Sequence, residues 1–411
     1  MSLLESTGAS DSLGAPSGTS RLFAAGAPDY AAHVRRFGPT PAAHDHQRLI
    51  SELEAAGLEG RGGAGFATWR KIAAVGPAAR SNAIVIANAA EGEPASAKDA
   101  VLIAKAPHLV IDGLLLAAAA VGARELYVYA GRDQLETVAR ALKERTDAKR
   151  IVLREAPDAF VSGEASAVVN SIGSGIALPK DHIVRMTDSG LRGRPTLVHN
   201  VETLAHLALI ARYGATWFRS VGTTDEPGTR LFTVSLDGAE RHVIELAGGL
   251  SVASALRAAG IEPAEVRAVL VGGYHGGWVP ASAFTASLSR AELKKFGAAP
   301  GAGVLVVLPR GHCGLRSSAR IATYLANQSA RQCGPCVNGL PAMASVLTSL
   351  ATKGRDDRLP HEVRRLAELV RGRGSCHHPD GTARLVLSTL SAFEADVAAH
   401  LKGRCLEAAD R

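Results

Sequence analysis

Residues 58–71 read Leu-Glu-Gly-Arg-Gly-Gly-Ala-Gly-Phe-Ala-Thr-Trp-Arg-Lys, a glycine-rich stretch with basic residues near both ends. Its glycines are Gly60, Gly62, Gly63 and Gly65. Without Cβ atoms, the backbone N–H groups of such a loop can come within hydrogen-bonding distance of an anion or a flat ring. Arg61 and Lys71 would supply positive charge to balance a phosphate group. The stretch therefore predicts a loop that binds a nucleotide-like ligand, and we name it the glycine loop.

The glycine loop contains the spacing Gly-x-Gly-x-x-Gly, which marks a dinucleotide-binding fold only when a β-strand comes directly before it. The segment before it instead carries apolar residues at helical spacing, namely Leu49, Ile50 and Leu53. Gly57 then suits the end of a helix. Because the loop follows a helix, the sequence disfavours a standard dinucleotide-binding fold.

The composition of the 411-residue chain excludes several classes of protein. Its formal net charge is +7, but the basic residues are scattered and aromatic residues make up only 4%, which disfavours a nucleic-acid partner. The longest apolar run, residues 109–123, is interrupted by Asp112 and is shorter than the roughly 20 residues that span a bilayer. The first residues show no secretory signal. We therefore expect a cytoplasmic protein without direct membrane insertion.

Beyond the glycine loop, buried strands and helices alternate, which predicts an α/β fold. Strands are expected at 82–87, 125–130 and 150–154, and helices at 108–121 and 133–146. From about residue 229, short apolar strands around a helix at 252–259 predict a small β-grasp-like unit, with a tight turn at Gly276 and Gly277. We divide the chain into a mobile N-terminal arm with an irregular lead-in at 1–42, an α/β domain at 43–228, a β-grasp domain at 229–310 and a helical bundle at 311–411.

Three further polar segments lie where a ligand could bind. Residues 88–99 directly follow the first strand, residues 160–167 precede a helix, and residues 194–203 open another helix. Backbone N–H groups and the helix dipole favour an anion at such helix N-termini. A single segment of this kind would be read as an ordinary helix cap, but several within one α/β domain favour an anionic ligand.

All five cysteines lie in the last quarter of the chain, at Cys313, Cys333, Cys336, Cys376 and Cys405. In a reducing compartment such a cluster indicates metal binding or redox chemistry before disulfides.

Taken together, these segments resemble the NADH-binding flavoprotein subunit of respiratory complex I and its relatives in NAD-linked hydrogenases and formate dehydrogenases. The resemblance covers residues from about 45 to 395. It is carried by Gly60 to Phe66, Thr68, Lys71, Asn88, Glu91, Glu93, Pro94, Lys98, Asp99, Pro107, His108, Gly163, Glu164, Asn170, Ser171, Gly190, Leu191, Gly193, Pro195, Thr196, Asn200 to Thr203, Cys333, Pro335, Cys336 and Gly339.

The resemblance implies an FMN bound in the α/β domain, an NADH stacked on it, a ubiquitin-like (SLBB-type) β-grasp domain and a helical bundle that holds a [4Fe–4S] cluster. It implies a cofactor site made by Gly60, Arg61, Gly62, Gly63, Gly65, Lys71, Asn88, Glu91, Gly163, Glu164, Val198, His199, Asn200 and Thr203. Phe66 would lie against the adenine of NADH, and Glu93 would bind its ribose hydroxyls and disfavour a 2′-phosphate. Hydride transfer between stacked cofactors needs no protein acid or nucleophile, so Glu91 and Glu93 would only support it. A thioredoxin-like [2Fe–2S] subunit is the implied partner.

Several positions depart from the family pattern. Ala90, Phe160, Ala165 and His199 stand where the family has Asp, Tyr, Glu and Asn. Each departure removes or alters a polar contact worth about 1–2 kcal/mol, which predicts weaker FMN binding. His182 and Arg185 replace the Lys and Phe that clamp the nicotinamide nucleotide. This replacement suggests that the nucleotide is held differently or that another electron donor is used.

The cluster ligands show the clearest departure. Cys333, Cys336 and Cys376 match three of the four family cysteines, but Ala330 replaces the first. Three outcomes stay open: a [3Fe–4S] or labile [4Fe–4S] cluster, a fourth ligand from His377, His378 or Cys313, or no cluster. Cys313 and Cys405 have no counterpart among the family ligands and are expected to be structural.

The sequence therefore predicts a flavin-dependent oxidoreductase that moves a hydride from NADH to FMN and electrons onward to an iron–sulfur centre or a partner subunit. The alternative is a degenerate paralogue that has lost turnover and serves as a binding or assembly module.

Overall fold

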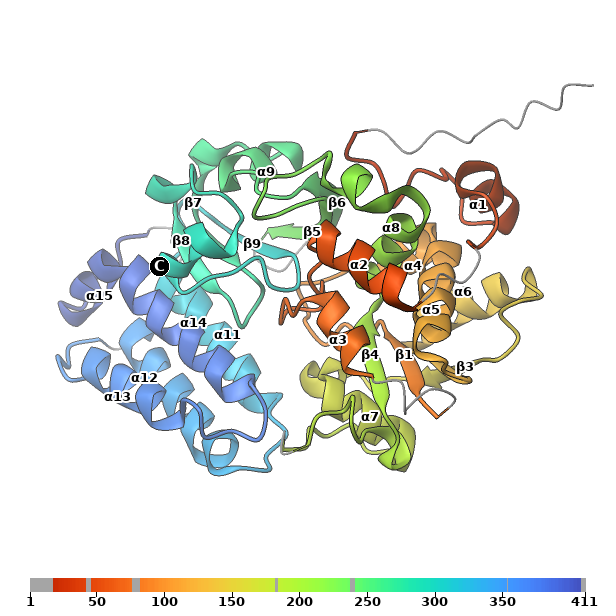
Figure 1. Ribbon diagram of the computed structural model, residues 1–411. Helices are drawn as coiled ribbons and strands as arrows, with labels where there is room; N and C mark the ends of the chain where they lie inside the picture. The colour runs from red at the N-terminus through yellow and green to blue at the C-terminus, as the bar shows by residue number, and fades with distance from the viewer. Residues whose placement is uncertain are drawn as a thin grey trace, which may run out of the picture.

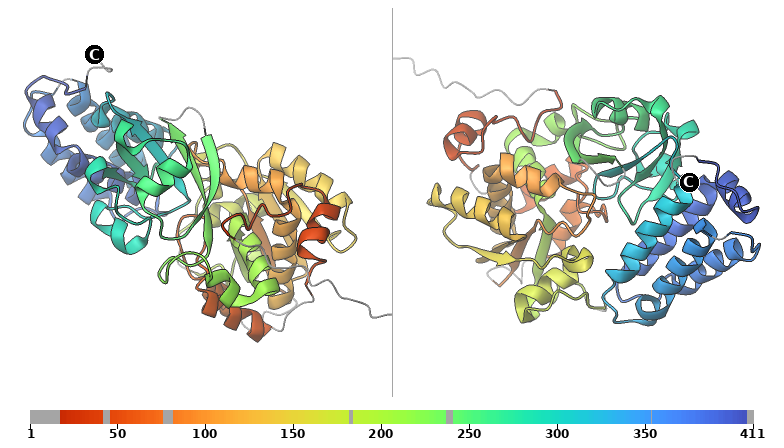
Figure 2. Two further views of the ribbon diagram at one scale, coloured as in Figure 1. Left: turned by 90° about the horizontal axis from the view of Figure 1, so that it is seen from above. Right: turned by 180° about the vertical axis from the view of Figure 1, so that it is seen from behind.

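The computed structural model describes residues 18–41, 46–75, 82–181, 184–236, 241–352 and 354–407 (Figure 1). Two β-sheets and a group of C-terminal helices form its three main regions. The regions lie in a row in Figure 2, with the second sheet between the first sheet and the C-terminal helices. Most of the expected N-terminal arm, residues 1–17, falls outside the described residues, and so do residues 42–45.

The first sheet is parallel, with strand order β3-β2-β1-β4. Its strands are β1 (Ile84–Asn88), β2 (Glu125–Ala130), β3 (Ile151–Glu155) and β4 (Thr196–Asn200). Asn88 at the end of β1 pairs in register with Asn200 at the end of β4. Because the strands are parallel, their polar carboxyl ends meet at one edge of the sheet, where open α/β sheets bind ligands.

Helices cover both faces of the first sheet, which explains why β1 is an unbroken apolar run. They are α2 (His46–Ala56), α3 (Thr68–Ala74), α4 (Lys98–Lys105), α5 (Pro107–Val121), α6 (Arg132–Lys143), α7 (Ala165–Ser174) and α8 (Val201–Arg219). Val85 and Ala87 belong to the core that contains α5 and α8, whereas Ile84 and Ile86 belong to the core with α7. α5 can approach α8 closely because Gly113 has no side chain. A Cβ at this position would lie only 2.0 Å from the Leu204 carbonyl oxygen.

The second sheet is mixed, with strand order β6-β5-β9-β7-β8. Its strands are β5 (Thr229–Leu236), β6 (Arg241–Ala247), β7 (Val266–Val271), β8 (Gly277–Pro280) and β9 (Val304–Pro309). β5 and β9 pair in parallel and the other pairs are antiparallel. The helix α9 (Val252–Ala258) packs into the same core, in the region where the sequence predicted a β-grasp-like unit.

The C-terminal helices are α11 (Gly314–Asn327), α12 (Leu340–Thr352), α13 (Leu359–Val370), α14 (His378–Ala392) and α15 (Glu394–Leu401). They share one core with the second sheet. The buried indole of Trp278 on β8 donates a 2.9 Å hydrogen bond to the Ser318 hydroxyl on α11, and its ring packs edge-on against Phe393. This contact anchors the helices to the sheet.

Three elements differ from the sequence-based expectations. Residues 196–200 form the strand β4, although the segment was expected to open a helix. The lead-in contains a helix, α1 (Tyr30–Phe37), whose first turn is capped by the Asp29 carboxylate accepting from the Ala32 N–H. The expected turn at Gly276 and Gly277 leads at once into the strand β8. Each missed element is at most eight residues long, too short for a clear periodic signal.

No single described helix is long and apolar enough to cross a membrane. The pair α4 and α5, bent by 97° at the break between them, has sufficient length and apolar composition only when the two helices are taken together.

A buried ionic cluster around Asp112 ties α5 to α8 and to the lead-in. The fully buried carboxylate accepts from Arg145 at 2.7 Å, from Arg212 on α8, and from Thr40 at 2.9 Å. Burial by itself raises its pKa, but the His33 hydrogen bond and the Arg212 charge more than offset this and hold the pKa of Asp112 well below its usual range. Asp112 is therefore ionised in the folded protein at ordinary pH.

We expect Asp112→Ala to destabilise the fold by about 3–5 kcal/mol, because it leaves the buried guanidinium of Arg212 without its carboxylate partner and that of Arg145 with Asp147 alone. Urea unfolding followed by circular dichroism measures the loss. The stability from this depressed pKa is present above about pH 4 and is lost only as the pH falls through the folded-state value. Asp356→Ala, which breaks an exposed pair with Arg358, is the matched control and should leave the midpoint unchanged. Equal midpoints for the two variants would contradict the prediction.

Candidate active site

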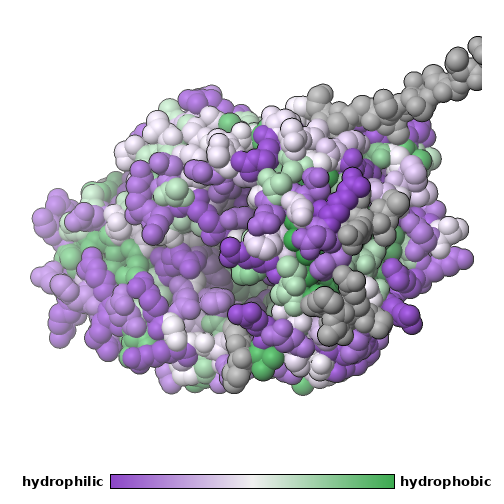
Figure 3. All heavy atoms as spheres, viewed as in Figure 1, coloured by the Kyte–Doolittle hydropathy of each residue, from purple (hydrophilic) through white to green (hydrophobic). Residues whose placement is uncertain are grey.

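A cavity of about 870 Å³ lies where the first sheet, the second sheet and the C-terminal helices meet. The space-filling view in Figure 3 shows the molecule hollowed between these regions, with mainly hydrophilic residues around the hollow. Of the residues predicted from the sequence, the cavity is lined by Gly62, Gly63, Asn88, Glu91, Glu93, Gly163, Glu164, Asn200 and Cys376. The structure thus brings the glycine loop, the three further polar segments and one cysteine to one place.

The glycine loop forms part of the cavity wall. An isolated bridge between Glu59 and Ala67 closes the loop at its base. Gly63 has φ +112°, and the nearest atom to a Cβ placed there would be the Ala302 nitrogen at 4.0 Å. The main chain at Gly63 therefore borders open space in the cavity, and only glycine adopts this conformation without strain.

The two cations of the glycine loop do not line the cavity. Arg61 is 4% exposed, and its guanidinium donates to the Thr229 carbonyl at 3.2 Å while its backbone N–H donates to the Thr203 hydroxyl. Burial, together with the nearby charge of Arg230, lowers the pKa of Arg61 to about 9. Lys71 donates to the Val198 carbonyl at 3.4 Å. Both side chains therefore contact neighbouring strands and support the loop from outside the cavity.

Other cations take their place along the cavity wall. They are Lys98 from α4, Arg290 from α10 (Arg290–Leu293), Lys294 just after it and Arg384 from α14. Arg290 crosses the glycine loop, donating to the Ala64 carbonyl at 3.2 Å and to the Glu59 carboxylate at 3.3 Å. The sequence analysis named Lys98 but missed Arg290, Lys294 and Arg384, because these three come from regions far along the chain and no local motif marks them.

The two predicted acidic residues have different surroundings. Glu91 accepts hydrogen bonds from the Ser96 hydroxyl and from the backbone N–H groups of Asp99 and Ala100, so it caps the start of α4. Glu93 accepts from the Tyr274 N–H at 2.8 Å, which joins the 88–99 segment to the second sheet. Burial raises the pKa of Glu93 to about 7 against the opposing effect of its backbone hydrogen bonds. Glu93 therefore changes charge near neutral pH at the cavity wall.

The two asparagines at the strand ends fix the shape of the cavity. Asn88 donates to the Gly163 carbonyl at 2.9 Å, and Asn200 donates to the Asp99 carboxylate at 2.6 Å. Asn200 also accepts from Lys98 at 3.1 Å and caps α8. Lys98 is fully buried and forms ion pairs with Asp99 at 2.6 Å and Glu202 at 3.0 Å. This network holds β1, β4 and α4 in one arrangement.

The remaining predicted cofactor residues do not line the cavity: Gly60, Gly65, Phe66, Val198, His199 and Thr203. Phe66 is 49% exposed. His199 is buried, and burial, together with the charge of Lys71, lowers its pKa to about 3, so its imidazole is neutral. Its Nε2 has no hydrogen-bond partner among the described residues. Of the altered clamp pair, His182 lies outside the described residues and Arg185 does not line the cavity.

Cys333, Cys336 and Cys376 come together beside the cavity. Burial, together with the hydrogen bond from Cys333, raises the pKa of the Cys336 thiol to about 12. The three thiols are close enough to interact electrostatically. Soft sulfur donors of this kind are the ligands that iron–sulfur clusters use.

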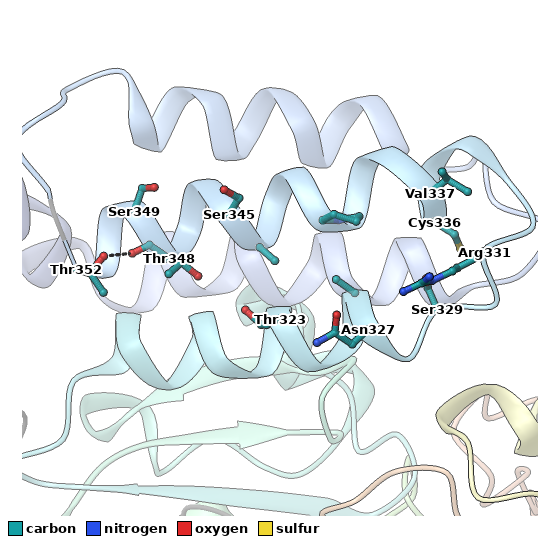
Figure 4. Close-up of a pocket in the computed structure, with 13 residues that line it drawn as sticks. Thr323, Asn327, Ser329, Arg331, Cys336, Val337, Ser345, Thr348, Ser349 and Thr352 are labelled. Carbon is teal, nitrogen blue, oxygen red and sulfur yellow. Dashed lines mark hydrogen bonds between the residues drawn. The ribbon is translucent and has the colours of Figure 1, made fainter.

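The cysteines lie between two hollows. Cys376 lines the central cavity, and Cys336 lines a second hollow of about 640 Å³ between α11 and α12. Figure 4 shows Arg331 and Cys336 at one end of this second hollow and Thr352 at the other, with Ser345 and Ser349 along α12. These three cysteines, which we call the cysteine triad, therefore lie between the central cavity and the second hollow.

The histidines next to the cysteines form their own chain of hydrogen bonds. His378 contacts the Leu325 carbonyl through Nε2 at 2.8 Å, so Nε2 carries a proton and donates. Its Nδ1 lies 3.0 Å from Nε2 of His275, which lines the central cavity. Both ring nitrogens of His378 are thus engaged.

Bare backbone at the carboxyl ends of parallel strands, a cavity of nucleotide-binding size and three converging cysteines define a flavin- and iron–sulfur-type nucleotide oxidoreductase. Residues 53–209 match the family described as the Nuo51 FMN-binding domain, and residues 316–400 match the NADH-ubiquinone oxidoreductase-F iron-sulfur binding region. Over these two ranges the chain is therefore similar to the FMN- and iron–sulfur-binding flavoprotein subunits of complex I and related NAD-linked enzymes.

Two curated relatives match over most of their length. The NADH-quinone oxidoreductase F subunit 2 of Rhizobium meliloti is 28% identical over 376 residues, which cover 87% of this chain and 89% of the relative. The NADH-quinone oxidoreductase F subunit of Rickettsia felis is 27% identical over 375 residues, covering 86% and 89%. The crystal structure of an NAD⁺-reducing [NiFe]-hydrogenase in the air-oxidised state matches with a TM-score of 0.79 and 30% identity, over 88% of this chain. This chain spans 64% of that hydrogenase chain.

Proposed function

We propose that this protein transfers a hydride from NADH to FMN in the central cavity and passes the electrons through an iron–sulfur centre at Cys333, Cys336 and Cys376 to another subunit. The observation that carries the proposal is the position of Cys376, because it lines the same cavity as the glycine loop. FMN, when bound, accepts a hydride and releases single electrons. The chain itself supplies binding, orientation and charge.

The cavity fits FMN because its wall combines bare backbone with oriented polar groups. Gly62 and Gly63 would lie against the flavin, and Asn88, Gly163, Glu164 and Asn200 would surround its polar edge and phosphate. Gly60, Arg61, Gly65, Lys71, Val198, His199 and Thr203 would act from behind by fixing the loop and β4. The hydrogen bonds that already hold the two asparagines keep the site preorganised, which lowers the cost of binding.

The nucleotide would lie toward the second sheet. Glu93 would accept from ribose hydroxyls, and the cations Arg290, Lys294 and Arg384 would face the diphosphate of NADH, since guanidinium and ammonium groups pair well with phosphate. Phe66, which is half exposed, would have to turn inward to stack on the adenine. This cationic set would replace the clamp that His182 and Arg185 no longer provide.

We expect the KM for NADH to rise up to tenfold for each pH unit below about 7, because protonation of Glu93 removes its negative charge and one of the two oxygens that can accept from the ribose hydroxyls. Glu93→Gln should raise the KM at pH 8 and flatten this pH dependence. Glu245→Gln is the matched control, because burial raises the pKa of Glu245 to about 7 at a site outside the cavity wall. An unchanged pH profile in Glu93→Gln would contradict the role of Glu93.

The structure narrows the choice of a fourth cluster ligand. His378 uses both ring nitrogens, and Cys313 lies in a separate group with His400 and Cys405. The His377 side chain is 86% exposed. We therefore propose a cluster held by three thiolates, either [3Fe–4S] or a [4Fe–4S] cluster with one iron that has no cysteine ligand.

Assembly with other subunits follows from the family, and a thioredoxin-like [2Fe–2S] subunit is the partner we propose. The second hollow beside Cys336 is the proposed exit for electrons. Val337 at its edge is an apolar side chain with 52% exposure, which suits a docking surface. The cytoplasmic location also stays a prediction.

The alternative function, a degenerate paralogue that acts as a binding or assembly module, is favoured by Ala330 and by Ala90 in the cavity wall. Anaerobic purification with FMN and iron quantification, followed by NADH titration of the flavin absorbance, decides between the two. Bound flavin that bleaches with NADH supports the oxidoreductase. A colourless protein that binds neither FMN nor iron supports the alternative.

A further inference from the structure

A second group of sulfur and nitrogen ligands lies apart from the cluster cysteines. Cys313 comes directly before α11, His400 lies in the last turn of α15, and Cys405 lies in the segment after α15. One ligand atom from each residue lies within 4.8 Å of the other two, and the Cys313 sulfur is 3.5 Å from Nε2 of His400. None of the three lines the central cavity or the second hollow. Three elements distant in sequence thus converge on one buried point.

The imidazole of His400 is oriented as a metal ligand would be. The ring hydrogen-bonds to the backbone carbonyls of Leu350 and Ala351 on α12, while Nε2 faces the sulfur of Cys313. A histidine that binds a metal usually donates its other ring N–H to a carbonyl or carboxylate, which fixes the ring and leaves one nitrogen lone pair for the metal. His400 is only 5% exposed, so this orientation is held by packing.

Cys313 is buried at the N-terminus of α11, with its sulfur turned toward His400. Its side chain is fully buried, and the backbone N–H groups of Leu315 and Arg316 in the first turn of α11 hydrogen-bond to it. Burial nevertheless raises the pKa of the Cys313 thiol to about 11, so the thiol is neutral without a metal, and a bound cation would supply the charge that a thiolate needs here. One turn before His400 on α15, the buried carboxylate of Asp396 keeps one oxygen, Oδ1, without a hydrogen-bond partner among the described residues. An unsatisfied acceptor close to this group suits an additional bound species.

We propose that Cys313, His400 and Cys405 bind one Zn²⁺ ion, with water as the fourth ligand. Two thiolates and a neutral imidazole are a ligand set that zinc prefers over hard cations such as Mg²⁺ or Ca²⁺. On binding, the two thiols lose their protons to solvent and form two zinc–sulfur bonds, with no change in oxidation state. The ion joins the C-terminal segment to the start of α11 and therefore stabilises this end of the bundle.

Metal analysis of the full-length protein, purified without chelators and equilibrated with zinc, tests the site. We expect about one zinc per chain in the wild type and in Cys376→Ser, and a loss of most of it in Cys405→Ser and His400→Gln. Cys376→Ser is the matched control, because it removes a cluster cysteine while it leaves the zinc ligands intact. Cys405 is partly exposed, so its replacement by serine should permit folding, which circular dichroism checks.

Cobalt substitution gives a readout that does not depend on activity. Co²⁺ bound by thiolates should show a sulfur-to-metal charge-transfer band that is lost in Cys405→Ser. Absence of zinc from the wild type, or an equal zinc content in Cys405→Ser, overturns the proposal. A disulfide between Cys313 and Cys405 would also overturn the proposal. It would show as an intact mass lower by two hydrogens and as failure of both cysteines to react with an alkylating agent.

Discussion

Gly63→Val is expected to lower the affinity for FMN by about a hundredfold, which corresponds to roughly 2.7 kcal/mol. The main chain at Gly63 borders the open cavity, and the position has φ +112°. A branched side chain there would occupy space that we assign to the flavin, and the backbone would also be strained. Isothermal titration of the apoprotein with FMN measures the change.

Gly260→Val is the control that separates backbone strain from the filling of the FMN cavity. Gly260 also has a positive φ of +77°, and a Cβ placed on it would meet nothing within 4 Å, but it lies away from the cavity. The two variants should therefore lose comparable stability in thermal unfolding, and only Gly63→Val should lose FMN. If Gly63→Val bound FMN as tightly as Gly260→Val, the flavin would not lie against the glycine loop.

Cys333→Ser is expected to remove the iron and to reduce electron transfer to an external acceptor by at least about a hundredfold, since a cluster with two remaining thiolates is poorly held. The bleaching of bound flavin by NADH should persist, because hydride transfer takes place in the central cavity. Iron quantification, stopped-flow absorbance and acceptor reduction measure the three quantities separately.

Two further variants define the cluster. Cys405→Ser should keep the iron, because Cys405 belongs to the group with Cys313 and His400. Ala330→Cys restores the first family cysteine and should raise the iron content and the lifetime of the cluster in air. Unchanged iron in Cys333→Ser would refute the assignment of the triad.

The sequence predicted the strands and helices that bury long apolar runs. β1, β2 and α5 were located within two residues, because their side chains are buried almost throughout. β4 escaped prediction because its last residue, Asn200, is also the cap of α8. The same asparagine therefore carried a helix-start signal that masked the strand before it.

The candidate site was predicted where a local segment has a distinctive composition or matches the family pattern. The composition of the glycine loop and of the 88–99 segment was enough to predict that they bind a ligand. Arg290 and Arg384 reach the cavity only through the packing of the second sheet and the bundle, which no local pattern reveals. Arg61 shows that a local pattern can also mislead. A cation beside glycines suggested a contact with phosphate, but the fold buries this side chain against the Thr229 carbonyl.

The meeting of three regions at one cavity has a consequence for biosynthesis. Gly62 is synthesised well before the opposite wall of the cavity, which includes Cys376 and Arg384. A partly synthesised chain therefore has no complete pocket, and the first sheet has to fold on the strength of its own core. Cofactor loading then reports that translation has reached the C-terminal helices and that they have docked.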